Sequence, residues 1–290
     1  MAIWARTRAF LDLIKFEHTV FALPFAYLGM ILAAGGWPGA WAFLWITVAM
    51  AAARTLGMGA NRLLDRAYDA TNPRTARRPL VTGEISVRTA VTGSALSAVV
   101  LAAAAYLLGP LPVRLLPGAF ALLVAYPLTK RFTVLTHFVL GAVDGLAPLG
   151  AWAAVRGSLT APADATAWIL FAVVTFWIAG FDLLYACQDV DFDRAHGLHA
   201  VPARYGVAAA LRLSAVCHAL TTLLLFALGL AAGLGWPYWI GAVAGAGLLA
   251  YEHALVRPGD LSRIDVAFFR INSVLSLTLF AATLAAVLIR

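Results

Sequence analysis

Two short segments of the chain carry closely spaced oxygen side chains. The first aspartate segment, residues 61–69, contains Asn61, Asp65 and Asp69, each four residues from the next. In a helix this spacing places the three side chains on one face, about 6 Å apart. Carboxylate and amide oxygens at this spacing are suitable ligands for a hard divalent cation. The segment therefore predicts a cation site, and the alternative is a solvated helix end with Asp–Arg pairs.

The second aspartate segment, residues 189–193, repeats this geometry with Asp189 and Asp193 one helical turn apart and Asp191 between them. Mg²⁺ is usually held in proteins by one or two carboxylates together with substrate phosphates. Two such segments could hold Mg²⁺ on either side of one diphosphate. The predicted metal ligands are Asn61, Asp65, Asp69, Asp189 and Asp193, and the four aspartates among them are the predicted catalytic residues.

A diphosphate also calls for cationic donors, because phosphate pairs with the planar guanidinium of Arg and with the point charge of Lys. Candidates are Arg74 and Arg78, which follow the first aspartate segment, and Lys130 and Arg131 in the sequence YPLTKR. For each of them the alternative is a cytoplasmic anchor, since positive-inside topology alone places Lys and Arg at cytoplasmic helix ends.

The elements that must position these residues are membrane helices. The chain has 290 residues, of which 62% are hydrophobic and only 12% charged, whereas a soluble domain has about 25% charged residues. A bilayer core about 30 Å thick needs about 20 apolar residues per helix. The long apolar runs predict an all-α, polytopic membrane protein with nine spans, at residues 19–36, 41–60, 88–109, 112–128, 133–155, 166–187, 207–232, 236–255 and 266–289.

The basic residues predict the orientation of these spans. With the N-terminus in the cytoplasm, only Arg114, Arg156 and Arg290 fall outside and Arg54 lies within a span, so the other Lys and Arg residues are cytoplasmic. Both aspartate segments then face the cytoplasm at a cell inner membrane. The net charge of +7 follows from this topology, and we expect no nucleic-acid partner because no polar segment interleaves basic and aromatic residues.

Three stretches of the sequence, NRLLDRAYDATNPRTARRP, YPLTKRFT and FDLLYACQDVDFDRAHGLHAVP, resemble the UbiA superfamily of intramembrane prenyltransferases. The resemblance implies a single integral-membrane domain over residues 1–290, with nine helices around a lipid-accessible cavity. It also implies that the two aspartate segments bind Mg²⁺-diphosphate and that Lys130 and Arg131 form a basic diphosphate-binding segment. Arg74 and Arg78 lie within the matched first stretch.

Within that superfamily, KFEHTVFALPF and YACQDVDFD are similar to 4-hydroxybenzoate polyprenyltransferases and to their menaquinone relatives of the futalosine pathway. The implied reaction is Mg²⁺-dependent transfer of a polyprenyl group from its diphosphate to an aromatic carboxylate, 4-hydroxybenzoate or 1,4-dihydroxy-6-naphthoate, in respiratory quinone synthesis. Lys15, Tyr126 and Asp191 are candidates for binding this acceptor. The main alternative is an ion-coupled secondary transporter, which also combines many spans with intramembrane carboxylates.

Overall fold

The computed structural model describes residues 11–14 and 19–289, and within these ranges its regular secondary structure is helical. Apolar runs form helices because a backbone in hydrocarbon must satisfy its own hydrogen bonds, and a helix does so within one segment. The long helices are α2 (Thr19–Ala34), α3 (Ala40–Leu64), α6 (Val87–Leu108), α7 (Pro110–Ala125), α8 (Thr136–Arg156), α9 (Ala165–Tyr185), α12 (Val207–Ala231), α13 (Trp236–Leu255) and α14 (Asn272–Leu288).

The described part of the chain is an all-α membrane protein. Seven of its helical stretches are long and apolar enough to cross a membrane: Ala40–Leu64, Val87–Leu108, Pro110–Arg131, Thr136–Arg156, Pro162–Ala195, Val207–Ala231 and Val266–Leu288. Helix α2, with 16 residues, is shorter, and α13 is not among the seven. Seven spans are therefore supported, whereas the ring of nine spans around a central cavity remains a prediction.

Glycines bring the central helices into direct backbone contact. A Cβ atom on Gly29 of α2 would lie 2.2 Å from the carbonyl oxygen of Pro148 in α8. A Cβ atom on Gly141 of α8 would lie equally close, 2.2 Å, to the carbonyl oxygen of Thr175 in α9. Small residues allow this approach, which drives helix packing in membranes. The packed helices α2, α8 and α9 form a rigid support for the elements at their ends.

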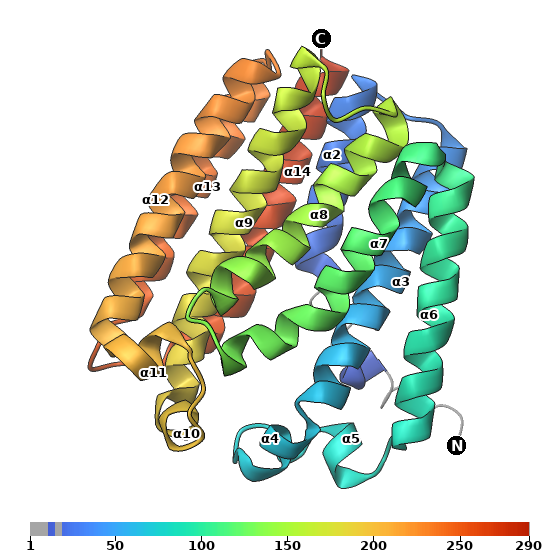
Figure 1. Ribbon diagram of the computed structural model, residues 1–290. Helices are drawn as coiled ribbons and strands as arrows, with labels where there is room; N and C mark the ends of the chain where they lie inside the picture. The colour runs from blue at the N-terminus through green and yellow to red at the C-terminus, as the bar shows by residue number, and fades with distance from the viewer. Residues whose placement is uncertain (1–10, 15–18, 290) are drawn as a thin grey trace, which may run out of the picture.

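The two ends of the helix bundle differ in composition. The short helices α4 (Arg66–Thr71), α5 (Pro79–Thr82), α10 (Val190–Ala195) and α11 (Val201–Tyr205) gather at the lower end in Figure 1, which we call the aspartate end. The 3₁₀ turn η2 (Tyr126–Arg131) connects α7 to α8, and the 3₁₀ turn η4 (Ala186–Asp189) connects α9 to α10. Exposed Trp37, Trp41, Trp168 and Trp236 lie at the opposite ends of the helices, as expected for side chains at a membrane interface.

Candidate active site

The first aspartate segment spans a break between two helices. Helix α3 ends at Leu64, and Asp65 is the junction residue before α4. The backbone N–H groups of Asp65 and Asp69 still donate to the carbonyls four residues earlier, at 2.9 and 2.8 Å. The spacing predicted one helix face for Asn61, Asp65 and Asp69 and did not predict the junction at Asp65. The helical repeat is nevertheless kept, and both aspartates are buried.

Asp65 is held by the YPLTKR segment, which folds as η2. Lys130 Nζ lies 2.6 Å from Oδ2 of Asp65, and the amide of Asn61 donates to the same oxygen at 3.3 Å. Arg131 donates to the carbonyl of Leu64 at 2.6 Å, which places its guanidinium 3.6 Å from Oδ1 of Asp65. The predicted basic segment and the first aspartate segment therefore meet at one carboxylate.

Asp69 is paired by the loop that follows α4. Arg78 Nη1 lies 2.6 Å from both carboxylate oxygens of Asp69, and the hydroxyl of Thr75 donates to the Asp69 carbonyl at 3.0 Å. The loop therefore folds back over the helix from which it emerges, and Arg78 reaches the carboxylate nine residues before it.

The same loop joins the two aspartate segments. Asn72 Nδ2 and Arg74 Nε each donate to Oδ1 of Asp189 at 2.9 Å, and Arg74 Nη2 pairs with the other oxygen. Arg74 also donates to the hydroxyl of Tyr185 at 2.9 Å. Burial alone would lower the pKa of the Arg74 guanidinium, but its hydrogen bonds and charge contacts with Asp189 raise that pKa above its usual value. Arg74 is therefore a permanent cation between the two segments.

The rest of the second aspartate segment is more open. Asp191 is exposed and Asp193 is half-buried. Within residues 11–14 and 19–289, neither carboxylate has an ion-pair partner at 4.0 Å or less. The backbone around them is anchored, because His199 N–H donates to the Lys130 carbonyl at 2.7 Å and Leu198 N–H donates to the Asp193 carbonyl at 2.9 Å. The carboxylate of Asp193 is thus free to take a cation.

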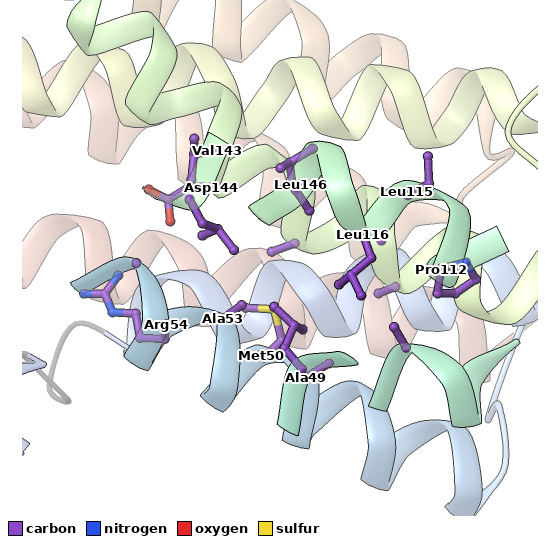
Figure 2. Close-up of a pocket in the computed structure, with 18 of the residues that line it drawn as sticks. Ala49, Met50, Ala53, Arg54, Pro112, Leu115, Leu116, Val143, Asp144 and Leu146 are labelled. Atoms are coloured by element: carbon purple, nitrogen blue, oxygen red, sulfur yellow. The ribbon is translucent and has the colours of Figure 1, made fainter. Parts of the chain in front are cut away.

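An apolar cavity of about 220 Å³ lies between α3, α6, α7 and α8. Arg54, Tyr126 and Asp144 are its polar lining residues. Figure 2 shows Arg54 and Asp144 together at one end of this cavity, with Leu115 and Leu116 toward the other. The Nε atom of Arg54 is buried and has no hydrogen-bond partner among the described residues. A guanidinium facing an apolar cavity in this way is suited to bind an anionic group.

Comparison with known proteins identifies the family. Residues 22–274 match the UbiA prenyltransferase family over most of the chain.

The chain belongs to the UbiA prenyltransferase family.

As a member of this family, the protein is a prenyltransferase. It is 34% identical over 265 residues to a 4-hydroxybenzoate octaprenyltransferase of Cupriavidus necator, with 90% of each chain covered. It is also 34% identical over 242 residues to a 4-hydroxybenzoate solanesyltransferase of Synechocystis, covering 82% of this chain and 81% of that protein. The transporter alternative is left without support.

Two solved structures have the same fold. The apo structure of a UbiA homolog from Aeropyrum pernix K1 has a TM-score of 0.85 and 33% identity, and the match covers 93% of this chain and 98% of that one. A UbiA homolog from Archaeoglobus fulgidus bound to GPP and Mg²⁺ has a TM-score of 0.72 and 21% identity, covering 96% of this chain and 99% of that one. At this lower identity the second match establishes the fold alone.

The donor atoms of this UbiA-family site fit Mg²⁺ bound together with a substrate. Oδ1 of Asp65 is a buried oxygen that accepts no hydrogen bond within the described ranges. In the same ranges, no three His, Cys, Asp or Glu side chains are arranged to hold a metal ion. Mg²⁺ can be held by one or two carboxylates when phosphate oxygens complete its coordination, and Asp65 supplies a carboxylate oxygen of this kind.

The predicted acceptor-binding residues have different positions in this prenyltransferase. Tyr126 lines the apolar cavity, Asp191 is exposed at the aspartate end, and Lys15 lies outside the described residues. Sequence reasoning assigned no role to Arg54 or Asp144. A signal for Arg54 was present, because it is an isolated charge within a predicted span, seven residues or about two helical turns before Asn61.

Proposed function

We propose that this prenyltransferase transfers a polyprenyl group from polyprenyl diphosphate to 4-hydroxybenzoate, with Mg²⁺, in respiratory quinone synthesis. The observation that carries the proposal is the meeting of the two aspartate segments across Arg74, which pairs with Asp189 although it belongs to the first segment's loop. A loop that spans both segments creates one polar site at the helix ends. The names of the relatives from Cupriavidus and Synechocystis supply the acceptor and the class of donor.

The charges of the site support a requirement for Mg²⁺. The site contains four carboxylates, Asp65, Asp69, Asp189 and Asp193, and five cationic side chains, Arg62, Arg74, Arg78, Lys130 and Arg131. The single excess positive charge does not compensate the negative charge of a diphosphate. Asn61, Asp65, Asp69, Asp189 and Asp193 are the residues that would hold Mg²⁺. When bound, the ion would neutralise the charge that develops on the leaving diphosphate.

The basic side chains have a direct role in the proposed chemistry. The allylic C–O bond breaks, and its electron pair stays on the diphosphate oxygen. Lys130 and Arg74 pair with Asp65 and Asp189, so these two cations would lie beside the diphosphate oxygens, and preorganised cations of this kind stabilise developing negative charge. A ring carbon of the acceptor then forms the new C–C bond with the allylic carbon, and the ring loses its proton from the same position.

Arg54 is the residue that we assign to the acceptor's carboxylate. It lies on the same face of α3 as Asn61, two turns away, which corresponds to about 10 Å along the helix axis. A para-substituted aromatic acid is shorter than this distance, so it fits between Arg54 and Asn61 with its carboxylate at Arg54 and its hydroxyl end toward the aspartate segments. The apolar walls of the cavity would contact the ring, and Tyr126 lines the same cavity.

The topology in this proposal follows from the distribution of the basic residues. We place the N-terminus and both aspartate segments on the cytoplasmic side of the inner membrane, and we treat residues 1–290 as one domain with nine spans. The Lys and Arg residues concentrate at the aspartate end of the described bundle, whereas exposed tryptophans lie at the other. Positive-inside topology favours this orientation, and the exposed tryptophans mark the opposite membrane interface.

The test is prenyl transfer by the purified protein in detergent, with Mg²⁺ or EDTA, polyprenyl diphosphate and one acceptor at a time. We expect Mg²⁺-dependent prenylation of 4-hydroxybenzoate and little product with EDTA. 1,4-Dihydroxy-6-naphthoate is the parallel acceptor, since its carboxylate could also bind Arg54. Product from the naphthoate alone would move the protein to menaquinone synthesis, and binding of prenyl diphosphate without product from either ring would overturn the acceptor assignment.

A further inference from the structure

The helical segment before α14 is a π-helix, η5 (Val266–Ile271), and a buried asparagine follows it. Single π turns inside helices are rare and occur frequently at functional sites. The side-chain amide of Asn272 donates to the carbonyls of Ala267 and Phe268, both at 3.1 Å. Its carbonyl oxygen accepts from Trp177 Nε1 of α9 at 2.6 Å. Asn272 therefore ties the π turn to the neighbouring helix.

The same side-chain amide of Asn272 also contacts a buried acid, Glu252, on α13. Glu252 is fully buried, and its Oε1 accepts from Asn272 Nδ2 at 3.1 Å. Its Oε2 has no hydrogen-bond partner among the described residues, and the nearest basic atom is His218 Nδ1 at 3.8 Å. An ionisable side chain within membrane helices is costly and is kept mainly where it has a role. Glu252 takes no direct part in the proposed reaction. Its connection to the site runs through its hydrogen bond with Asn272.

The π turn places Phe268 in a column of aromatic rings that leads to the second aspartate segment. The Phe268 ring lies 4.3 Å from the ring of Tyr185 and 5.1 Å from that of Phe181, measured between centroids. The Tyr185 hydroxyl accepts from Arg74, whose guanidinium carbon lies 5.0 Å from the centre of the Tyr185 ring. Arg74 in turn pairs with Asp189. The aromatic column therefore ends beside the residues that would hold the diphosphate.

We propose that Asn272 is a positioning residue that holds Phe268 against Tyr185, so that the two rings form a wall that protects the allylic cation from water. The proposal rests on the proposed prenyl transfer. The wall acts by filling space, because Phe268 packs against the Tyr185 ring at 4.3 Å and the guanidinium of Arg74 lies over that ring at 5.0 Å. A Phe268 ring that moved away from Tyr185 would leave room for water beside the cation.

The two fates of the allylic cation give different products. Attack by a ring carbon of 4-hydroxybenzoate forms a C–C bond and releases the ring proton, which yields the prenylated acid. Attack by water forms a C–O bond and releases a proton from the water, which yields the prenyl alcohol. Both fates release one diphosphate. The fraction of released diphosphate that appears as prenyl alcohol therefore measures how well the wall excludes water.

The experiment compares this alcohol fraction in the wild type, Asn272→Leu, Phe268→Leu and Phe268→Tyr. We expect Asn272→Leu and Phe268→Leu to raise the ratio of alcohol to prenylated acid by about three- to tenfold, a change of at most about 1.4 kcal/mol in the relative barriers of the two attacks. Phe268→Tyr keeps an aromatic ring at this position and should have the same ratio of alcohol to prenylated acid as the wild type. The matched control is Thr283→Val, which removes another buried hydrogen bond of α14 outside this network and should leave the ratio unchanged.

A loss of both products by the same factor in Asn272→Leu and Phe268→Leu, at an unchanged ratio, would overturn the proposal and leave Asn272 with a role in folding only. A ratio that also rises in Thr283→Val would overturn it as well. Wild-type protein that releases no diphosphate would instead refute the proposed function, so the two failures are distinguishable. Phe268→Leu keeps an apolar side chain, which keeps the test valid if Asn272→Leu does not fold.

Discussion

The two aspartate segments use similar spacing but differ in how their charges are compensated. In the first, Asp65 pairs with Lys130 and Asp69 with Arg78, and only 3% and 9% of these carboxylate side chains are exposed. In the second, Asp189 pairs with a residue from the other segment and is 15% exposed, while Asp193 has no ion-pair partner in the described ranges. The first segment is therefore preformed, and the second offers an open carboxylate.

The difference follows from the elements that carry each segment. The first emerges from the 25-residue helix α3, and its loop folds back on the helix end. The second consists of the short elements η4 and α10, which are fixed by hydrogen bonds to their neighbours. The two buried carboxylates of the first segment are compensated by cations, whereas the half-buried carboxylate of Asp193 is open to a metal ion. Carboxylates at the same spacing in a sequence can therefore have different roles in the folded protein.

The largest loss of activity is expected when one carboxylate is removed from either segment. We expect Asp65→Ala and Asp189→Ala each to lower kcat by at least about 10²-fold, because each removes a group that organises charge around the leaving diphosphate. Asp191→Ala is the matched control, since its side chain is exposed, and should stay near wild type. Steady-state kinetics of purified, folded variants would measure this, and full activity in both main variants would contradict the metal assignment.

Arg54, the proposed acceptor-binding residue, lies on α3, the helix that leads into the first aspartate segment. Arg54→Met should raise KM for 4-hydroxybenzoate by about tenfold or more, since a hydrogen bond to a charged group contributes about 1.5–3 kcal/mol. KM for prenyl diphosphate should stay unchanged. The control is 4-hydroxybenzyl alcohol, an acceptor without the carboxylate, on which wild type and variant should act equally. An equal rise in both KM values would place Arg54 in the diphosphate site instead.

The carboxylates of the two segments should also differ in their contributions to the free energy of unfolding. Asp69→Asn removes the negative charge that two short contacts with Arg78 compensate, and we expect a loss of about 1–3 kcal/mol. Asp193→Asn removes a carboxylate without a described partner and should change stability by less than about 0.5 kcal/mol. Thermal unfolding in detergent without Mg²⁺ would compare them. Equal destabilisation would show that the second segment is preformed as well.

Among the substitutions of ion-paired residues, Lys130→Ala should have the smallest effect on turnover. Lys130→Ala should lower turnover only several-fold, corresponding to about 1 kcal/mol, because Arg131 also lies close to Asp65 and can take over part of its charge compensation. The double variant Lys130→Ala/Arg131→Ala should lose far more than the product of the single effects. Additive losses, measured as kcat/KM for prenyl diphosphate, would mean that the two cations act independently.

The sequence by itself determined the helices and the spacing of the two aspartate segments. The predicted ranges 88–109 and 207–232 correspond to α6 (Val87–Leu108) and α12 (Val207–Ala231), because hydrocarbon thickness and internal hydrogen bonding constrain each span locally. The helical repeat of Asn61, Asp65 and Asp69 was predictable for the same local reason, although the break at Asp65 was not.

Only the tertiary structure decided which charges meet. Arg74 and Asp189 are 115 residues apart, and their contact depends on how α2 and α8 place α3 relative to α9 and on the fold of one loop, which local periodicity does not encode. The same is true of Arg54 and Asp144 at the end of the cavity, and of Asn272 beneath the aromatic column. Local sequence patterns determine which side chains share a helix face, but packing between distant helices determines what each face contacts.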